Sequence, residues 1–145
     1  MLEGINKRIL NFNIIIMNKN RPWLIAFWFY VGICVSISIS AYLKIIPNEI
    51  ERFPYYDTIL HFILMGFSAF LGHLAFNKRK INIFTIPLPL VPIIISIVVL
   101  IEECLQIFSP NRSFDLVDLA ADFLGIVFFT LLAEKWKIKG EGRRK

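Results

Sequence analysis

Residues 101–125 read IEECLQIFSPNRSFDLVDLAADFLG. Two apolar segments meet in this stretch, and acidic and polar residues stand where a membrane helix would otherwise be apolar. A carboxylate near the middle of a membrane helix costs about 3 kcal/mol or more if it meets lipid, and less toward the interface. We therefore expect these residues to face one another between helices, and we take them as the first candidate for a functional site.

The whole chain has the composition of a membrane protein of one domain. Its 145 residues are 57% hydrophobic, and the mean hydropathy is +0.64. The apolar spans described below exclude a water-soluble enzyme. The formal net charge of +5 does not indicate a nucleic-acid partner, because Lys and Arg lie mainly at the ends of the apolar segments.

Four apolar segments are long enough to cross about 30 Å of hydrocarbon as helices. They run approximately over Pro22–Ile46, Asp57–Phe76, Ile86–Phe108 and Leu116–Trp136. The chain is therefore predicted to be all-α, a four-helix transmembrane bundle. Pro92 lies inside the third segment and is expected to kink that helix.

The distribution of positive residues predicts the orientation of the bundle. The first connection carries Arg52 against two glutamates, and the third carries Arg112 alone. The N-terminal flank, the second connection and the C-terminal tail are richer, with Lys7, Arg8, Lys19, Arg21, Lys78, Arg79, Lys80, Lys135, Lys137, Lys139, Arg143, Arg144 and Lys145. Since cytoplasmic segments carry the excess of Lys and Arg, both termini are predicted to be cytoplasmic.

Three parts of the chain are expected. Residues 1–21 form an N-terminal cytoplasmic or interfacial segment, residues 22–136 the transmembrane domain, and residues 137–145 a basic cytoplasmic tail. The segment Ile9–Met17 is too short to span the membrane. Either residues 1–16 lie along the membrane surface or Met17 is the true start of the protein, and we favour the second.

Polar residues of three predicted helices fall at matching depths near the outer side. Asp57 and His61 are four residues apart on one helix, as are Asp118 and Asp122 on another, so each pair shares a helix face about 6 Å apart along the axis. The deeper layer contains His61, Glu103 and Asp122, and the layer above it contains Asp57, Gln106, Asp118 and the loop residue Arg112. We expect these two layers to form one shared pocket.

The helical spacing does not decide which glutamate enters this pocket. Glu102 and Gln106 are separated by about 40° around the helix, and Glu103 and Gln106 by about 60°. Glu102 therefore either borders the pocket or turns toward the first helix.

Carboxylates with one imidazole suit general acid–base chemistry, a proton relay, or a hard divalent cation held by oxygens and one nitrogen. Arg112 is placed to meet an anionic group such as a phosphate or carboxylate. The alternative is that the polar residues only hold the helices together, a purpose that uncharged side chains usually serve at lower cost.

Some of these residues favour a structural role. Asp118 lies in the first turn of its helix, where the helix dipole and the free N–H groups stabilise a carboxylate, and Asp115 is expected to be an N-cap. His73 near a helix end and Gly125 as a packing point are expected to be structural.

At these positions the chain resembles the VanZ-like family of small integral membrane proteins. The resemblance covers roughly residues 55–130 and rests on Asp57-x-x-x-His61, then Glu103-x-x-Gln106-x-Phe108-x-Pro110-x-Arg112, and then Asp118, Asp122 and Gly125. It selects Glu103 over Glu102 as the equivalent acid. The chain departs from the family pattern at Thr58, where lysine is usual, at Asp122, where asparagine is typical, and at Phe129, which is often a small residue.

The resemblance implies a multi-pass protein of the bacterial cytoplasmic membrane that lowers susceptibility to the glycopeptide antibiotic teicoplanin through an outer-leaflet polar pocket. The alternative is a membrane-embedded acid/base or metal-assisted enzyme acting on an anionic lipid or a lipid-linked glycan. Expected partners are the lipid bilayer and a lipid-linked glycan, an anionic lipid or the lipoglycopeptide itself, with no nucleic acid.

The residues expected to carry the function are His61, Glu103, Gln106, Arg112 and Asp118. They are expected to be supported by Asp57, Asp122 and Glu102. The cofactor and any bound metal stay undefined, and so does whether the protein is an enzyme. A transporter is disfavoured because four short helices without an inverted repeat leave little room for alternating access.

Overall fold

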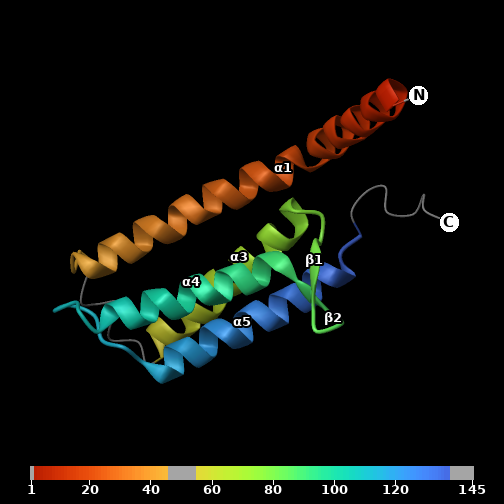
Figure 1. The fold of residues 1–145 in the computed structure, drawn as a ribbon. Helices are drawn as coiled ribbons and strands as arrows, with labels where there is room; N and C mark the ends of the chain where they lie inside the picture. The colour runs from red at the N-terminus through yellow and green to blue at the C-terminus, as the bar shows by residue number, and fades with distance from the viewer. Residues whose placement is uncertain (1, 46–54, 138–145) are drawn as a thin grey trace.

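The computed structural model describes residues 2–45 and 55–137, with side chains described from residue 20 onward. Four helices form a bundle in this part of the chain (Figure 1), which confirms the predicted all-α membrane fold. They are α1 (Leu2–Tyr42), α3 (Tyr56–Ala75), α4 (Leu90–Gln106) and α5 (Leu116–Lys135). A small antiparallel hairpin of β1 (Lys80–Ile83) and β2 (Ile86–Pro89) lies at one end of the bundle, beside the end of α5.

Three of these helices are long and apolar enough to cross a membrane. The spans are Asn20–Tyr42 within α1, Tyr56–Ala75 and Leu116–Lys135. Large apolar side chains such as Phe29, Leu124 and Leu131 are exposed on their outer faces, where lipid would cover them. The helix α4 has 17 residues, which corresponds to about 26 Å, at the short end of what spans a bilayer. A fourth span and the cytoplasmic position of the termini stay predictions.

The third predicted segment, Ile86–Phe108, was wrong at its start. Residues Ile86–Pro89 form strand β2, and the helix begins only at Leu90. Phe84 and Thr85 both have positive φ, of 47° and 73°, as the two central residues of a tight hairpin turn do. Proline is disfavoured in a helix interior but is tolerated in a two-stranded hairpin, because each strand there is an edge strand. An apolar run alone does not distinguish these two outcomes.

The expected kink at Pro92 also needs correction. Pro92 is the third residue of α4 and lies in its first turn. The amide hydrogen that proline lacks has no partner within the helix at this position, so the residue interrupts no hydrogen bond.

The helices α3 and α5 pack closely at Gly66 and Gly125. A Cβ atom added to Gly125 would lie 2.2 Å from the carbonyl oxygen of Phe62, and one added to Gly66 would lie 2.9 Å from the carbonyl oxygen of Gly125. Small residues let membrane helices approach this closely. The expected packing role of Gly125 is therefore confirmed. The helix α1 instead packs chiefly on α3, through aromatic contacts such as Tyr30 with Phe67.

At the hairpin end, His73 lies fully buried in the last turn of α3. This position is consistent with the structural role expected for it. Its Nε2 lies 3.1 Å from Oε1 of Glu134 on α5, and the Nζ of Lys80 on β1 lies 2.8 Å from the same oxygen. Lys78 donates to the carbonyl oxygens of Glu134 and Trp136, at 3.0 and 2.8 Å, and so caps the end of α5. These contacts attach the hairpin to α3 and α5.

Candidate functional site

The polar residues gather at the opposite end of the bundle from the hairpin. Asp57 and His61 come from the first two turns of α3, and Asp118 and Asp122 from those of α5. The last turn of α4 supplies Glu103 and Gln106, and the connection from α4 to α5 supplies Arg112. Asp115 caps α5 by accepting from the backbone nitrogen of Val117 at 2.7 Å, which confirms its expected role as an N-cap.

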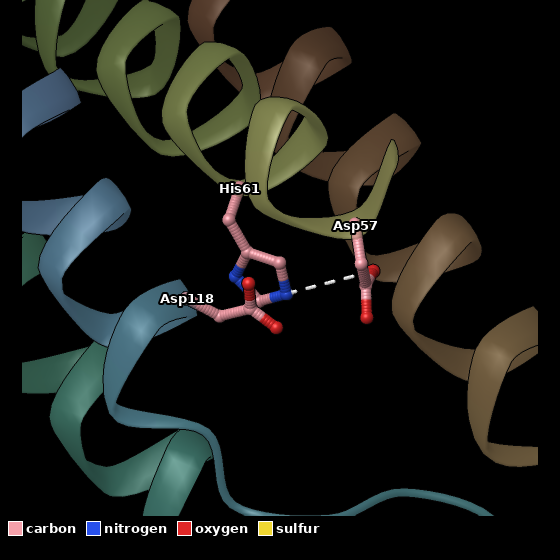
Figure 2. A group of neighbouring side chains, drawn as sticks. All are labelled: Asp57, His61 and Asp118. Atoms are coloured by element: carbon pink, nitrogen blue, oxygen red, sulfur yellow. Dashed lines mark ion pairs between the residues drawn. The ribbon is translucent and has the colours of Figure 1, made fainter. Parts of the chain in front are cut away.

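The layer nearer the end of the bundle is organised around Arg112. Its Nη1 lies 3.0 Å from Oδ2 of Asp57, and its Nη2 lies 3.2 Å from Nε2 of His61. Figure 2 shows the side chains of Asp57, His61 and Asp118 pointing toward one another. Asp57 Oδ1 lies 3.9 Å from His61 Nε2. Asp118 in turn accepts a hydrogen bond of 2.7 Å from the hydroxyl of Thr58.

The deeper layer joins His61 to two buried acids. His61 Nδ1 lies 3.0 Å from Oδ2 of Asp122 and 3.9 Å from Oε1 of Glu103. Both acids are only 1% exposed. Because a guanidinium can only donate, Arg112 requires an unprotonated Nε2 on His61. A neutral His61 then carries its proton on Nδ1 and donates it to Asp122.

Gln106 contacts both of the glutamates between which the helical spacing could not choose. Its Nε2 donates to Glu102 at 2.8 Å and to Glu103 at 3.1 Å. Glu102 turns toward the first helix, where the hydroxyl of Ser38 donates to it at 3.3 Å. Glu103 turns toward His61 and also accepts from the backbone nitrogen of Asp115 at 3.4 Å. The geometry therefore agrees with the selection of Glu103 as the acid nearer the centre of the cluster.

Two cavities adjoin this cluster. A polar cavity of about 530 Å³ is lined by residues that include Tyr55, Asp57, Thr58, Arg112, Asp115 and Asp118. An apolar cavity of about 350 Å³ lies among α1, α3 and α4, lined by residues such as Val31, Cys34, Leu64, Met65, Ile95 and Val98. Asp57 and Arg112 line both cavities, and His61, Glu102 and Asp122 stand at the polar end of the apolar one. The site thus offers adjoining polar and apolar space.

The family model described as VanZ/LLP1 matches residues 8–137, which is most of the chain. The chain belongs to the VanZ/LLP1 family. The resemblance inferred from the motifs is confirmed, and the match extends beyond them in both directions. No curated protein and no solved structure matches the chain.

In this VanZ-like protein the structure brings together the residues named from the sequence. Asp57, His61, Glu102, Glu103, Gln106, Arg112, Asp118 and Asp122 are linked by the contacts given above, and their functional roles stay predictions. Sequence reasoning missed two members of this network, Ser38 on α1 and Thr58 on α3. Thr58 follows Asp57 directly, and its departure from the family pattern was a signal that could have been used. Nothing in the sequence separates Ser38 from the neighbouring serines of α1.

Proposed function

We propose that this VanZ family protein binds an amphiphilic ligand, a lipid or a lipid-linked glycan, with its polar head in the polar cavity and its chain in the apolar cavity. The observation that carries the proposal is that Asp57 and Arg112 line both cavities. Guanidinium groups suit phosphate and carboxylate, so Arg112 would hold the anionic part of the head. Burial of the ligand's apolar chain would contribute about 25 cal/mol of binding free energy for each Å² of apolar surface that is removed from water.

The site would face the outside of the bacterial cytoplasmic membrane, with both termini in the cytoplasm. The positive residues Lys78, Lys80, Lys135 and Lys137 lie at the hairpin end, away from the two cavities. The positive-inside rule favours this orientation. The polar cavity then lies at the level of the outer headgroups.

Binding can be tested by filling the apolar cavity while leaving every charged residue in place. Cys34 lines this cavity, whereas Cys104 is exposed on α4, so the same substitution at the two cysteines gives a matched pair. We expect native mass spectrometry of protein purified in mild detergent to show a bound amphiphile on the wild type and on Cys104→Trp. Cys34→Trp should lose it, because the indole occupies the space of the chain. Equal occupancy of Cys34→Trp and Cys104→Trp would contradict the proposal.

The physiological consequence that we propose is lower susceptibility to teicoplanin. A lipidated glycopeptide partitions into membranes, so a protein with an outer amphiphile site is well placed to limit its access. In a sensitive host at matched membrane levels, the wild type should raise the inhibitory concentration of teicoplanin but not of vancomycin. We expect Glu103→Gln to lose this protection and Cys104→Ser to keep it. Absence of protection by the wild type would reject the resistance role but not amphiphile binding.

The second candidate is an acid/base enzyme acting on the same ligand, an anionic lipid or lipid-linked glycan. It is favoured by the hydrogen bond between His61 and the buried Asp122, an arrangement that orients an imidazole for proton transfer. The two candidates differ in what happens to the ligand. An enzyme would leave chemically altered amphiphile in membranes that contain the wild type, and unaltered amphiphile in those that contain Glu103→Gln.

A further inference from the structure

The deeper layer of the site holds three side chains whose potential metal-ligand atoms lie close together. They are His61, Glu103 and Asp122, and the three donor atoms lie within 4.8 Å of one another. His61 Nδ1 is 3.0 Å from Asp122 Oδ2 and 3.9 Å from Glu103 Oε1. Ligand atoms about 2.0–2.2 Å from one divalent ion are separated by distances of this size.

An acidic cluster alone is weak support for a metal, and the second observation here is an unsatisfied oxygen. Asp122 Oδ1 is buried and has no hydrogen-bond partner among the described residues. Asp122 as a whole is 1% exposed and lines the apolar cavity. Leaving a buried carboxylate oxygen without a partner costs about 1–3 kcal/mol or more. A cation bound beside Asp122 would remove that cost.

We infer that His61, Glu103 and Asp122 form a site for a single divalent first-row ion such as Mn²⁺ or Zn²⁺. Two carboxylates and one imidazole suit these ions, whereas Ca²⁺ prefers six to eight oxygens. Three protein ligands leave coordination positions for water or for an oxygen of the bound head group. The inference rests on the proposed function, since His61 and Asp122 stand at the polar end of the apolar cavity, beside the Asp57 and Arg112 that line both cavities.

Binding of the ion at Nδ1 would change the hydrogen bonds around His61. A metal on Nδ1 requires the ring proton on Nε2, so Arg112 can no longer donate to that nitrogen. Asp57 Oδ1, 3.9 Å from Nε2, would accept the relocated proton once the two atoms approach to hydrogen-bond distance. A carboxylate behind a metal-binding histidine is a common arrangement that fixes the orientation of the ring. Arg112 keeps its contact with Asp57 and gains freedom to meet an anionic ligand.

The test uses Mn²⁺ alone, titrated into full-length protein that has been treated with a chelator and kept in detergent. We expect electron paramagnetic resonance to show one bound Mn²⁺ per chain, with a ¹⁴N coupling from the His61 imidazole. Glu103→Gln and Asp122→Asn should each weaken binding by about tenfold or more, because each removes a charged ligand. The control is Glu134→Gln at the hairpin end of the bundle, which removes an acidic charge but no ligand and should leave the affinity unchanged.

The inference is overturned if the wild type shows no ¹⁴N coupling, or if all three variants bind Mn²⁺ alike. The coupling is measured on the wild type, so poor folding of a variant does not mask the result. Failure of the proposed function is distinguishable, because Mn²⁺ binding is also measured in Cys34→Trp, which should carry no amphiphile. Mn²⁺ binding in Cys34→Trp without a bound amphiphile would keep the metal site and separate it from the ligand. An amphiphile on chelated wild type that takes up no Mn²⁺ would reject the metal site alone.

Discussion

We expect Gly125→Ala to lower the free energy of unfolding by about 3 kcal/mol, the upper part of the usual range for overpacking a dense interior. The added Cβ would lie 2.2 Å from the carbonyl oxygen of Phe62 and 3.0 Å from its carbonyl carbon. Both are backbone atoms, so no side chain can rotate away, and α3 and α5 must separate. The same helices carry His61 and Asp122 toward each other, and their separation should also weaken the candidate site.

The measurement is equilibrium unfolding of the purified protein in mixed detergent micelles, followed by circular dichroism. Gly32→Ala is the matched control, because a Cβ at Gly32 meets nothing within 4 Å. It should leave stability unchanged or raise it by up to about 1 kcal/mol, since alanine is the better helix former. Equal effects of the two substitutions would show that the α3–α5 contact is not as close as the structure has it.

The second large effect is expected at the buried pair of His61 and Asp122. Asp122→Leu should destabilise the protein by about 3 kcal/mol, because it removes the buried acceptor of the Nδ1 proton of His61. The remaining acid nearby, Glu103, is 3.9 Å from that nitrogen, too far for a good hydrogen bond.

A double-mutant cycle completes this prediction. The double variant His61→Leu/Asp122→Leu should lose less stability than the two single variants added together, because an apolar pair replaces a buried polar pair without leaving an orphan. A double variant as unstable as the sum would show that the two residues are not coupled. A stable double variant that no longer binds Mn²⁺ or the amphiphile would show that the pair is kept for binding and not for folding.

Much of the fold could be predicted because the apolar segments are long and their polar positions recur at helical spacing. Asp57 with His61, and Asp118 with Asp122, share helix faces on any regular helix. The hairpin at Lys80–Pro89 escaped prediction because its apolar strands read like the start of the next helix. Pro87 and Pro89 lie inside the third predicted segment but precede the helix, whereas Pro92 lies in its first turn.

The sequence by itself determined that the chain forms long apolar helices and which faces of them are polar. It also determined that these polar faces lie at the same end of the bundle. Only the tertiary structure decided that Glu102 turns to Ser38 while Glu103 turns to His61, and that Glu134 meets His73 at the other end. It also decided that a cavity separates α1 from α4 beside the cluster. The physical reason is that helical periodicity sets angles within one helix, whereas rotation and distance between helices depend on contacts such as Gly125 against Phe62.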